Sequence, residues 1–328
     1  MAGFIFRRIL WAIPTLIVVS FISFVIIQLP PGDYVTAYAA QLRHSGDYIS
    51  LEQEALLRAQ MGLNDPMIVQ YWRWITNIVL YGNFGHSLEW NAPVSSLIWD
   101  RLGLTLAIST LSMLFTWAIA IPVGVYAATR QYSVLDYVFT IFGFLGKGVP
   151  DFLLALILMW MAFAWLNMDV GGLLSPRYQN APWTIDKVIN LLSHLWIPVV
   201  VLATGGAAGL LRVMRANMLD ELGKPYVETA YAQGLSERQV VWGYPVRVAL
   251  NPFISTVGWA LPALFSGDVI TAVVLNLPTT GPLLLQALKM QDMYLAGSFI
   301  LILSVFTVIG TLISDILLAW SDPRIRYS

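Results

Sequence analysis

The sequence contains no cysteine and few charged residues. The absence of cysteine among 328 residues excludes disulfide bonds, thiolate metal sites and cysteine nucleophiles. Charged side chains make up 11% of the chain, whereas a soluble domain carries about 25%. The formal net charge is −1, and a protein that binds nucleic acid by neutralising phosphates needs an excess of basic residues. The composition therefore excludes an ordinary water-soluble protein, and we expect no nucleic-acid partner.

Histidine is scarce as well. His44, His86 and His194 lie far apart and lack the spacing of a metal-binding motif such as H-E-x-x-H. The nucleotide-binding pattern G-x-x-x-x-G-K-[S/T] is also missing. Gly146-Lys147-Gly148 resembles a fragment of it, but no Ser or Thr follows the lysine. We therefore expect the chain to bind no metal and no cofactor of its own.

Long apolar runs dominate what is present. Apolar residues make up 58% of the chain. A bilayer core about 30 Å thick requires about 20 such residues in a helix that rises about 1.5 Å per residue. Runs of this kind occur at residues 9–29, 103–129, 135–166, 188–211, 247–277 and 294–320. The sequence therefore predicts an all-α, polytopic membrane protein with six transmembrane helices.

Basic residues are distributed unevenly among the segments that join these helices. If the N-terminus lies inside, the inner segments hold ten basic residues: Arg7, Arg8, Arg130, Arg212, Arg215, Lys224, Arg238, Arg247, Arg324 and Arg326. The outer segments are about twice as long and hold fewer. Because Lys and Arg concentrate in cytoplasmic loops, we expect both the N-terminus and the C-terminus to be cytoplasmic.

The runs divide the chain into four parts. They are residues 1–30 with the first helix, an extracytoplasmic segment at 31–102, a core of five helices at 103–320 that includes an inner loop at 216–244, and a cytoplasmic tail at 321–328. In the outer segment, Ser50 with Gln53 three residues later is typical of a capping box. Residues 67–80 carry Trp and Tyr, which suits a helix at the lipid boundary. The same residues also suit an amphipathic helix packed over the other helices.

The inner loop carries the most distinctive pattern. Ala230 and Ala232 favour helix, and Gly234 stands where a glycine ends a helix in the left-handed region. Ser236 then caps a second short helix, with Gln239 at its third position. The loop therefore predicts two short helices joined by a tight turn. Small residues lie on one side of the pair and charged residues on the other, a shape that fits a groove in another protein.

This loop resembles that of a known family. Glu228-Thr229-Ala230, followed by Gly234, is similar to the E-A-A-x3-G loop of importer permeases of the ATP-binding-cassette (ABC) type, with Thr229 in place of the central Ala. The surrounding residues resemble the dipeptide, oligopeptide and nickel branch. Four further stretches match this branch in order, namely residues 7–15, Pro31-Gly32-Asp33, Val149-Pro150-Asp151-Phe152 and Asp322-Pro323-Arg324-Ile325-Arg326.

The resemblance implies a transport subunit, not an enzyme, in a bacterial or archaeal cytoplasmic membrane. It would form half of a translocation path for short peptides or similar small solutes, although relatives in the branch carry oligosaccharides, nickel or opines. The implied partners are membrane lipid, a second homologous permease, an extracytoplasmic solute-binding protein and two ABC ATPase subunits that hold ATP and Mg. By position, the residues that couple the chain to the ATPase would be Glu228, Thr229, Ala230, Gly234 and Leu235.

An ion-coupled carrier is an alternative from another class. Lys147, Asp151 and Asp268 lie within apolar runs, where ionisable side chains are costly and point to function. Lys147 and Asp151 are four residues apart, so we expect one helix face to carry both and let them pair. All three are candidates for lining the translocation path. The alternatives are a structural ion pair for the first two and an interhelical hydrogen bond for Asp268.

An intramembrane enzyme is a third class. Ser193 and His194 are adjacent at the start of the fourth run, but a boundary histidine that is hydrogen-bonded to a loop explains the pair better than a catalytic dyad. Asp151 and Asp268 lack a recognisable catalytic context, so we expect no catalytic residue. The glycine-rich stretch at 205–209 predicts a helix-packing face, which includes contact with a second permease, or a hinge.

Overall fold

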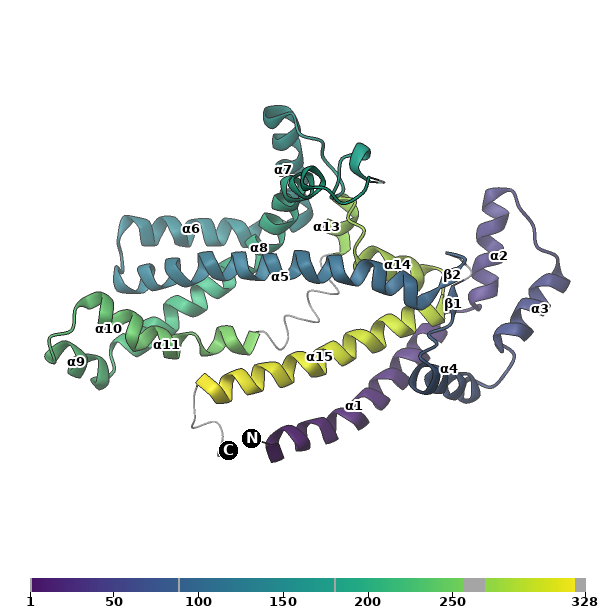
Figure 1. Ribbon diagram of the computed structural model, residues 1–328, viewed down its shortest axis with the longest axis horizontal. Helices are drawn as coiled ribbons and strands as arrows, with labels where there is room; N and C mark the ends of the chain where they lie inside the picture. Colours follow the sequence, from purple (N-terminus) through teal and green to yellow (C-terminus); the bar gives the residue numbers. More distant parts are fainter. Residues whose placement is uncertain (1, 88, 180, 257–268, 322–328) are drawn as a thin grey trace. The chain divides into compact units, whose positions relative to one another are not determined.

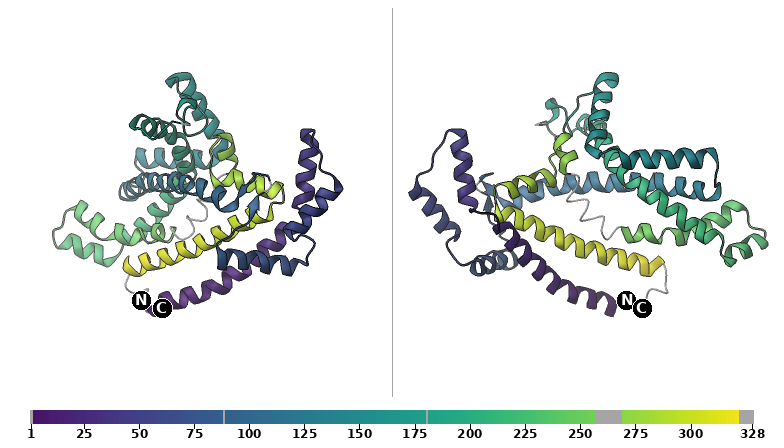
Figure 2. Two further views of the ribbon diagram at one scale, coloured as in Figure 1. Left: turned by 45° about the vertical axis from the view of Figure 1, so that its right-hand side comes forward. Right: turned by 180° about the vertical axis from the view of Figure 1, so that it is seen from behind.

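The computed structural model describes residues 2–87, 89–179, 181–256 and 269–321, which are mostly helical (Figure 1, Figure 2). The first helices are α1 (Ala2–Gln28), α2 (Tyr34–Ser45), α3 (Leu51–Met61), α4 (Met67–Tyr81), α5 (Val94–Thr129), α6 (Val134–Gly148) and α7 (Asp151–Leu166). They are followed by the 3-10 helix η1 (Pro176–Tyr178), α8 (Ile185–Leu222), α9 (Pro225–Ala232), α10 (Glu237–Gly243), α11 (Pro245–Ala249), α13 (Val269–Val274), α14 (Thr280–Lys289) and α15 (Met293–Ser321). The short antiparallel strands β1 (His86–Ser87) and β2 (Ala92–Pro93) pair His86 with Pro93. The predicted all-α class is confirmed.

Four of the described helices are long and apolar enough to cross a membrane. They are Phe6–Gln28 within α1, the whole of α5 and of α8, and Met293–Leu318 within α15. Helices α6 and α7 pass the same test together, as a pair bent by 104°. The prediction of a polytopic membrane protein is confirmed. The remaining predicted span, 247–277, includes residues 257–268, which lie outside the described residues, so the count of six helices stays a prediction.

The third predicted span, 135–166, is broken at Pro150. A residue before proline is pushed towards extended backbone, and Val149 has φ −95° and ψ 124°. Helix α6 therefore ends at Gly148, and α7 begins in a new direction at Asp151. Lys147 lies in the last turn of α6 and Asp151 in the first turn of α7. The prediction that one continuous helix face carries both residues is wrong.

Helix α8 is longer than the apolar run at 188–211 that predicts it. Thr184 caps its N-terminus, with the hydroxyl oxygen accepting the Lys187 N–H at 3.3 Å. The helix continues through residues 216–222 of the predicted inner loop and ends before Gly223. Pro225 follows two residues later, and a helix does not readily continue into a proline. The inner loop is therefore shorter than the polar composition of 216–244 predicts.

The chain forms two compact units, Met1–Leu104 with Thr279–Ile309 (unit 1) and Thr105–Pro278 with Gly310–Ser328 (unit 2). The core of unit 1 is aromatic. The Phe24 ring centroid lies 5.5 Å from that of Tyr71 and 5.7 Å from that of Trp74. A Cβ atom on Gly297 would lie 3.1 Å from Cζ2 of Trp74, so α15 approaches the indole closely. Helices α1, α4 and α15 thus pack around Trp74, which is 2% exposed.

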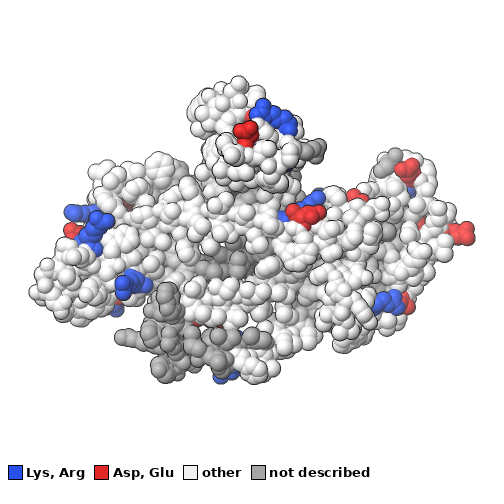
Figure 3. Space-filling model, viewed as in Figure 1, with Lys and Arg blue, Asp and Glu red and all other residues white. Residues whose placement is uncertain are grey.

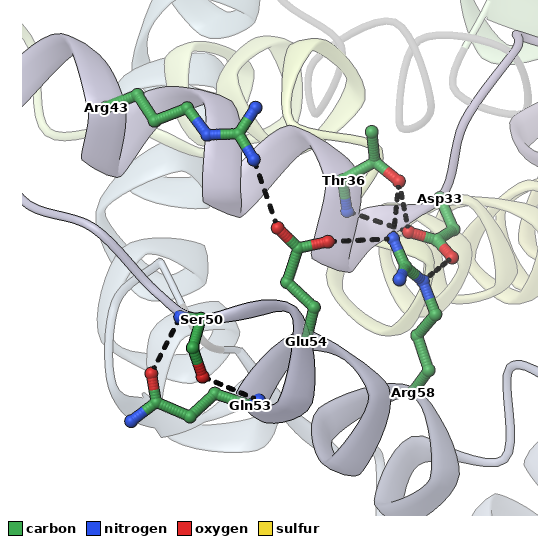
Figure 4. A network of polar contacts seen from close by, with 7 residues as sticks. All are labelled: Asp33, Thr36, Arg43, Ser50, Gln53, Glu54 and Arg58. Atoms are coloured by element: carbon green, nitrogen blue, oxygen red, sulfur yellow. Dashed lines mark hydrogen bonds and ion pairs between the residues drawn. The ribbon is translucent and has the colours of Figure 1, made fainter.

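Helices α2 and α3 of unit 1 are joined by charged side chains (Figure 4). The capping box predicted at Ser50 and Gln53 is confirmed. Arg58 donates to Asp33 at 2.7 Å and lies 3.4 Å from Glu54, which also pairs with Arg43 at 3.2 Å. Partial burial would raise the pKa of the Asp33 carboxyl, but hydrogen bonds from Arg58 and Thr36 outweigh this effect and hold the pKa below its usual value.

In unit 2, the other helices pack closely on α8. A Cβ atom on Gly124 of α5 would lie 2.6 Å from Cβ of Met214, and one on Gly146 of α6 would lie 2.9 Å from Cγ2 of Thr204. A Cβ on Gly143 would lie 3.9 Å from Ala208. Small residues let helix backbones approach in a membrane. The predicted packing face at 205–209 is therefore confirmed for contacts within this chain, and contact with a second permease stays a prediction.

Charged side chains are sparse on the face of the molecule seen in Figure 3. Many large apolar side chains of the described residues are exposed, and they include Phe142 at 68%, Trp160 at 60% and Trp165 at 68%. Soluble proteins rarely expose large contiguous apolar patches. Exposed apolar side chains on membrane-spanning helices are expected where lipid replaces water as the solvent.

Candidate functional site

The helix pair predicted in the inner loop consists of α9 and α10. Pro225 occupies the first turn of α9, where its missing N–H leaves no helix hydrogen bond unmade. After α9 the chain turns at Gly234, whose φ of +80° lies in the left-handed region. The Ser236 N–H donates to Oε1 of Gln239 at 3.0 Å in a capping box that begins α10. The two short helices and the glycine turn that the sequence predicts are confirmed.

One side of the pair is a small apolar core. Val227 and Ala230 of α9 and Val240 of α10 are buried together, and Leu235 of the turn packs against them. Ala230 is 3% exposed and therefore holds α9 against α10 instead of offering a contact surface. Two of the five predicted coupling residues, Ala230 and Leu235, thus shape the pair from within.

The opposite side of the pair is open. Glu228, Thr229 and Gly234 are exposed. The Thr229 hydroxyl donates to the Pro225 carbonyl at 2.9 Å, so this side chain lies back along its own helix. A Cβ atom on Gly234 would have no described atom within 4 Å. The exposed side therefore offers one carboxylate and a bare turn of backbone to a partner.

Three side-chain contacts anchor the pair to neighbouring segments of unit 2. The Tyr226 hydroxyl donates to the Glu221 carboxylate, and the Tyr226 and Tyr244 ring centroids are 6.5 Å apart. Burial and the Glu221 carboxylate raise the pKa of Tyr226 above its usual value, so the hydroxyl remains a donor. Arg130 and Glu237 form an exposed pair at 3.8 Å. The pair is thereby tied both to the end of α8 and to the end of α5.

One ion pair close to this region was not predicted from the sequence. Asp136 of α6 accepts hydrogen bonds from Nε and Nη2 of Arg215 in α8 at 3.1 and 3.0 Å. It also accepts the Tyr132 N–H at 3.0 Å, and its side chain is 5% exposed. The two charged residues are 79 positions apart, and nothing in the linear sequence connects them. The adjacent Ser133 cap, which accepts the Asp136 N–H at 3.2 Å, predicts only a helix start.

The deep ionisable residues lie in different surroundings. Lys147 is exposed in the last turn of α6. Asp151 lies over Gly205 of α8, where an added Cβ would stand 3.2 Å from Oδ1 and 3.3 Å from Oδ2. The absence of a side chain at Gly205 therefore makes room for this carboxylate. Asp268, the third candidate for the translocation path, lies outside the described residues.

Ser193 and His194 do not form a nucleophile and base. Nδ1 of His194 lies 2.7 Å from the Asn190 carbonyl oxygen, which can only accept, so Nδ1 carries the proton. The Ser193 hydroxyl donates to the same carbonyl at 2.7 Å. A protonated Nδ1 cannot take a proton from Ser193, which lies 3.3 Å away. Within the described residues, no group of three or more His, Asp or Glu side chains is arranged to hold a metal ion.

Comparison with known families covers almost the whole chain. Residues 120–327 match the model described as "Binding-protein-dependent transport system inner membrane component". Residues 1–109 match the corresponding N-terminal model, "Binding-prot-dependent transport system membrane comp, N-term".

Individual proteins match along their full length. The "Oligopeptide transport system permease protein AppB" of Bacillus subtilis (strain 168) is 36% identical over 328 residues, which cover 100% of both chains. The "Dipeptide transport system permease protein DppB" of Escherichia coli (strain K12) is 30% identical over 343 residues, which cover 100% of this chain and 99% of DppB.

Among solved structures, a chain of the MetNI methionine ABC transporter, in inward-facing conformations, superposes with a TM-score of 0.49 at 16% identity. The superposition covers 70% of this chain and 97% of that chain.

Proposed function

The chain belongs to the family of binding-protein-dependent transport system inner membrane components, and on this basis we propose that it carries short peptides through the membrane as half of a translocation path. It is a permease subunit of an ABC importer and not an enzyme. Family membership favours this function over the ion-coupled carrier and the intramembrane enzyme. The names of AppB and DppB, an oligopeptide and a dipeptide permease, support peptides as the solute. Oligosaccharides, nickel and opines are the alternatives in the same branch.

The observation that carries the mechanism is the construction of the α9–α10 pair. Its inner side is closed by Val227, Ala230 and Val240, whereas Glu228 and the Gly234 turn are exposed. We infer from this small core and from the contacts with neighbouring segments that the pair moves as one piece. We propose that this surface docks on an ATPase subunit and passes the movement of that subunit to α8 through Glu221 and Tyr226.

The remaining parts of the transporter follow from this role. We propose that two ATPase subunits hold ATP and Mg, that a second permease completes the path, and that an extracytoplasmic protein delivers the solute. Both termini and the α9–α10 pair then lie in the cytoplasm. Lys147, Asp151 and Asp268 stay predicted residues of the path.

The coupling role is tested at Gly234. An L-residue in the left-handed region costs about 1–2 kcal/mol, so Gly234→Ala is expected to distort the turn and lower solute uptake at least fivefold. The matched control is Gly223→Ala, because Gly223 has φ −84° and an added Cβ would also meet no described atom within 4 Å. Uptake is measured in cells that express the complete transporter, with membrane levels checked for each variant. Full uptake by the Gly234→Ala variant would show that the turn does not couple.

The solute is tested by competition. Uptake of a radiolabelled dipeptide and of a radiolabelled pentapeptide is measured with an unlabelled oligosaccharide, Ni²⁺ or an opine in excess. We expect only unlabelled peptides to compete. No peptide uptake, together with uptake of a radiolabelled oligosaccharide, Ni²⁺ or opine by the same cells, would replace the peptide proposal and leave the coupling proposal intact.

A further inference from the structure

Helix α4 has two apolar faces and buries only one of them. Tyr71 and Trp74 are 5% and 2% exposed and belong to the core of unit 1. On the other side, Ile68 is 62%, Trp72 60% and Val79 71% exposed. These three residues lie along one stripe of the helix, since they are spaced by four and seven positions. A helix in an aqueous segment would carry polar residues on that stripe.

The buried face of α4 fixes its depth. The Tyr71 hydroxyl lies 2.8 Å from Oγ of Ser20 and 3.4 Å from the Ile17 carbonyl oxygen, and both belong to the membrane-spanning part of α1. Ser20 stands eight residues before Gln28, the end of that span, which is about 12 Å along a helix that rises about 1.5 Å per residue. Tyr71 therefore reaches well into the hydrocarbon core, which is about 30 Å thick.

Three polar side chains of α4 have hydrogen-bond or ion-pair partners close by. The Thr76 hydroxyl donates to the Trp72 carbonyl at 2.6 Å within its own helix. The Gln70 amide donates to the carbonyl oxygens of Leu63 and Asp65 at 3.1 and 2.8 Å. Arg73 is the only charged residue of the helix sequence, and it pairs with Asp65 at 2.6 Å. An exposed stripe without free charge is compatible with hydrocarbon.

The exposed stripe also continues an existing apolar surface. Phe21 of α1 is 40% exposed, and its ring packs edge-on against that of Tyr71 at a centroid distance of 5.2 Å. Ile17, one turn away, is 55% exposed. Helix α3, by contrast, carries Glu52, Glu54 and Arg58 and has the composition of a helix in water. Lipid that covers the flank of α1 would therefore also cover α4.

We propose that α4 lies within the membrane, in the leaflet that holds the C-terminal end of α1, with lipid acyl chains against Ile68, Trp72 and Val79. The segment at 31–102 is then not wholly aqueous. Its α2–α3 part stands in water, and α4 returns into the bilayer beside α1. This placement does not depend on the solute that the transporter carries.

The absence of cysteine makes the test direct. Ile68→Cys, Trp72→Cys and Val79→Cys variants each carry one spin label, in the complete transporter assembled with cysteine-free partner subunits in phosphatidylcholine and phosphatidylglycerol nanodiscs. Power saturation measures collisions with oxygen, which concentrates in hydrocarbon, and with a water-soluble nickel chelate. The control is Tyr48→Cys, which lies between α2 and α3 at a position that is 80% exposed.

We expect the three α4 labels to collide several-fold more with oxygen than with the nickel chelate, and the Tyr48 label to show the reverse. Nickel access at all three α4 positions would place the helix in water and overturn the proposal. Protection from both reagents would overturn it as well, because a second permease or the binding protein would then cover the stripe. Each variant is accepted only if its thermal stability matches that of the parent, as expected for exposed positions.

Discussion

At the scale of single residues, Asp292 shows how burial and hydrogen bonding oppose each other. Asp292 is 1% exposed. Its carboxylate accepts hydrogen bonds from the Ser87 hydroxyl at 2.6 Å and from the Leu295 N–H at 3.0 Å. Burial raises the pKa of this carboxyl, the hydrogen bonds lower it only in part, and the pKa remains above its usual value. Folding therefore favours the protonated form of this carboxyl, relative to the unfolded chain.

This raised pKa predicts the pH dependence of stability. A carboxyl whose pKa is higher when folded than when unfolded contributes stability below its ordinary pKa of about 3.9 and loses it as the pH rises through the folded value. Asp292→Asn keeps an acceptor for Leu295 and cannot ionise. We expect the parent to lose stability relative to this variant as the pH is raised from 4 to 8, measured by thermal unfolding of the purified protein.

The control for this prediction is Asp33, whose carboxyl pKa is lowered. Its contribution is present above about pH 3.9 and is lost as the pH falls through the folded value. The Asp33→Asn variant should therefore differ from the parent by a constant amount between pH 5 and 8 and by less in stronger acid. A stability difference at Asp292 that does not change with pH would contradict the prediction.

At the scale of elements, one buried ion pair adds to the packing of α6 on α8. Asp136, near the N-terminus of α6, accepts two hydrogen bonds from Arg215, near the C-terminus of α8, and their side chains are 5% and 29% exposed. Removing one partner of a fully buried pair costs about 3–5 kcal/mol. Because Arg215 keeps some exposure, we expect Asp136→Asn to lower the free energy of unfolding by about 2–3 kcal/mol, as measured by denaturant titration in detergent.

The exposed pair on the same side of unit 2 supplies the comparison. Arg130 and Glu237 stand 3.8 Å apart with side chains 64% and 60% exposed. An exposed pair of this kind contributes about 0–1 kcal/mol, so Arg130→Gln is expected to change stability little. Equal losses in the two variants would show that burial does not distinguish these pairs.

The same elements show what a sequence can predict here. The α9–α10 pair was predictable in detail, because capping at Ser236 and the left-handed turn at Gly234 depend on residues within a few positions. Pro150 was visible too, but an apolar run does not report the direction of a helix, so the bend of 104° between α6 and α7 was missed. The pairing of Asp136 with Arg215 depends on packing between distant segments. For the same reason, the room that Gly205 leaves for Asp151 had no sequence signal.

At the scale of the whole molecule, the bend between α6 and α7 decides the topology. If the pair crosses the membrane once, the chain before α6 and the chain after α7 lie on opposite sides. If the pair returns to the side where it began, α8 places the α9–α10 pair on the outer side of the membrane and not on the predicted inner side. The combined length of α6 and α7, 15 and 16 residues, amounts to about 46 Å of helix at about 1.5 Å per residue. Laid end to end, this length exceeds a core about 30 Å thick, but the bend of 104° brings the two ends of the pair closer together. The concentration of basic residues on the predicted inner side favours a single crossing.

We therefore predict that the pair crosses once, which single cysteines in the cysteine-free chain test directly. Tyr48 and Trp183 are 80% and 69% exposed on two of the predicted outer segments, which follow the first and the third predicted spans, and Gln131 is exposed between α5 and α6. A membrane-impermeant maleimide should label Tyr48→Cys and Trp183→Cys in intact cells, and Gln131→Cys only after permeabilisation. Labelling of Trp183→Cys only in permeabilised cells, with Tyr48→Cys still labelled from outside, would mean that α6 and α7 form a re-entrant loop. The α9–α10 pair would then face away from the cytoplasm, where no ATPase could reach it.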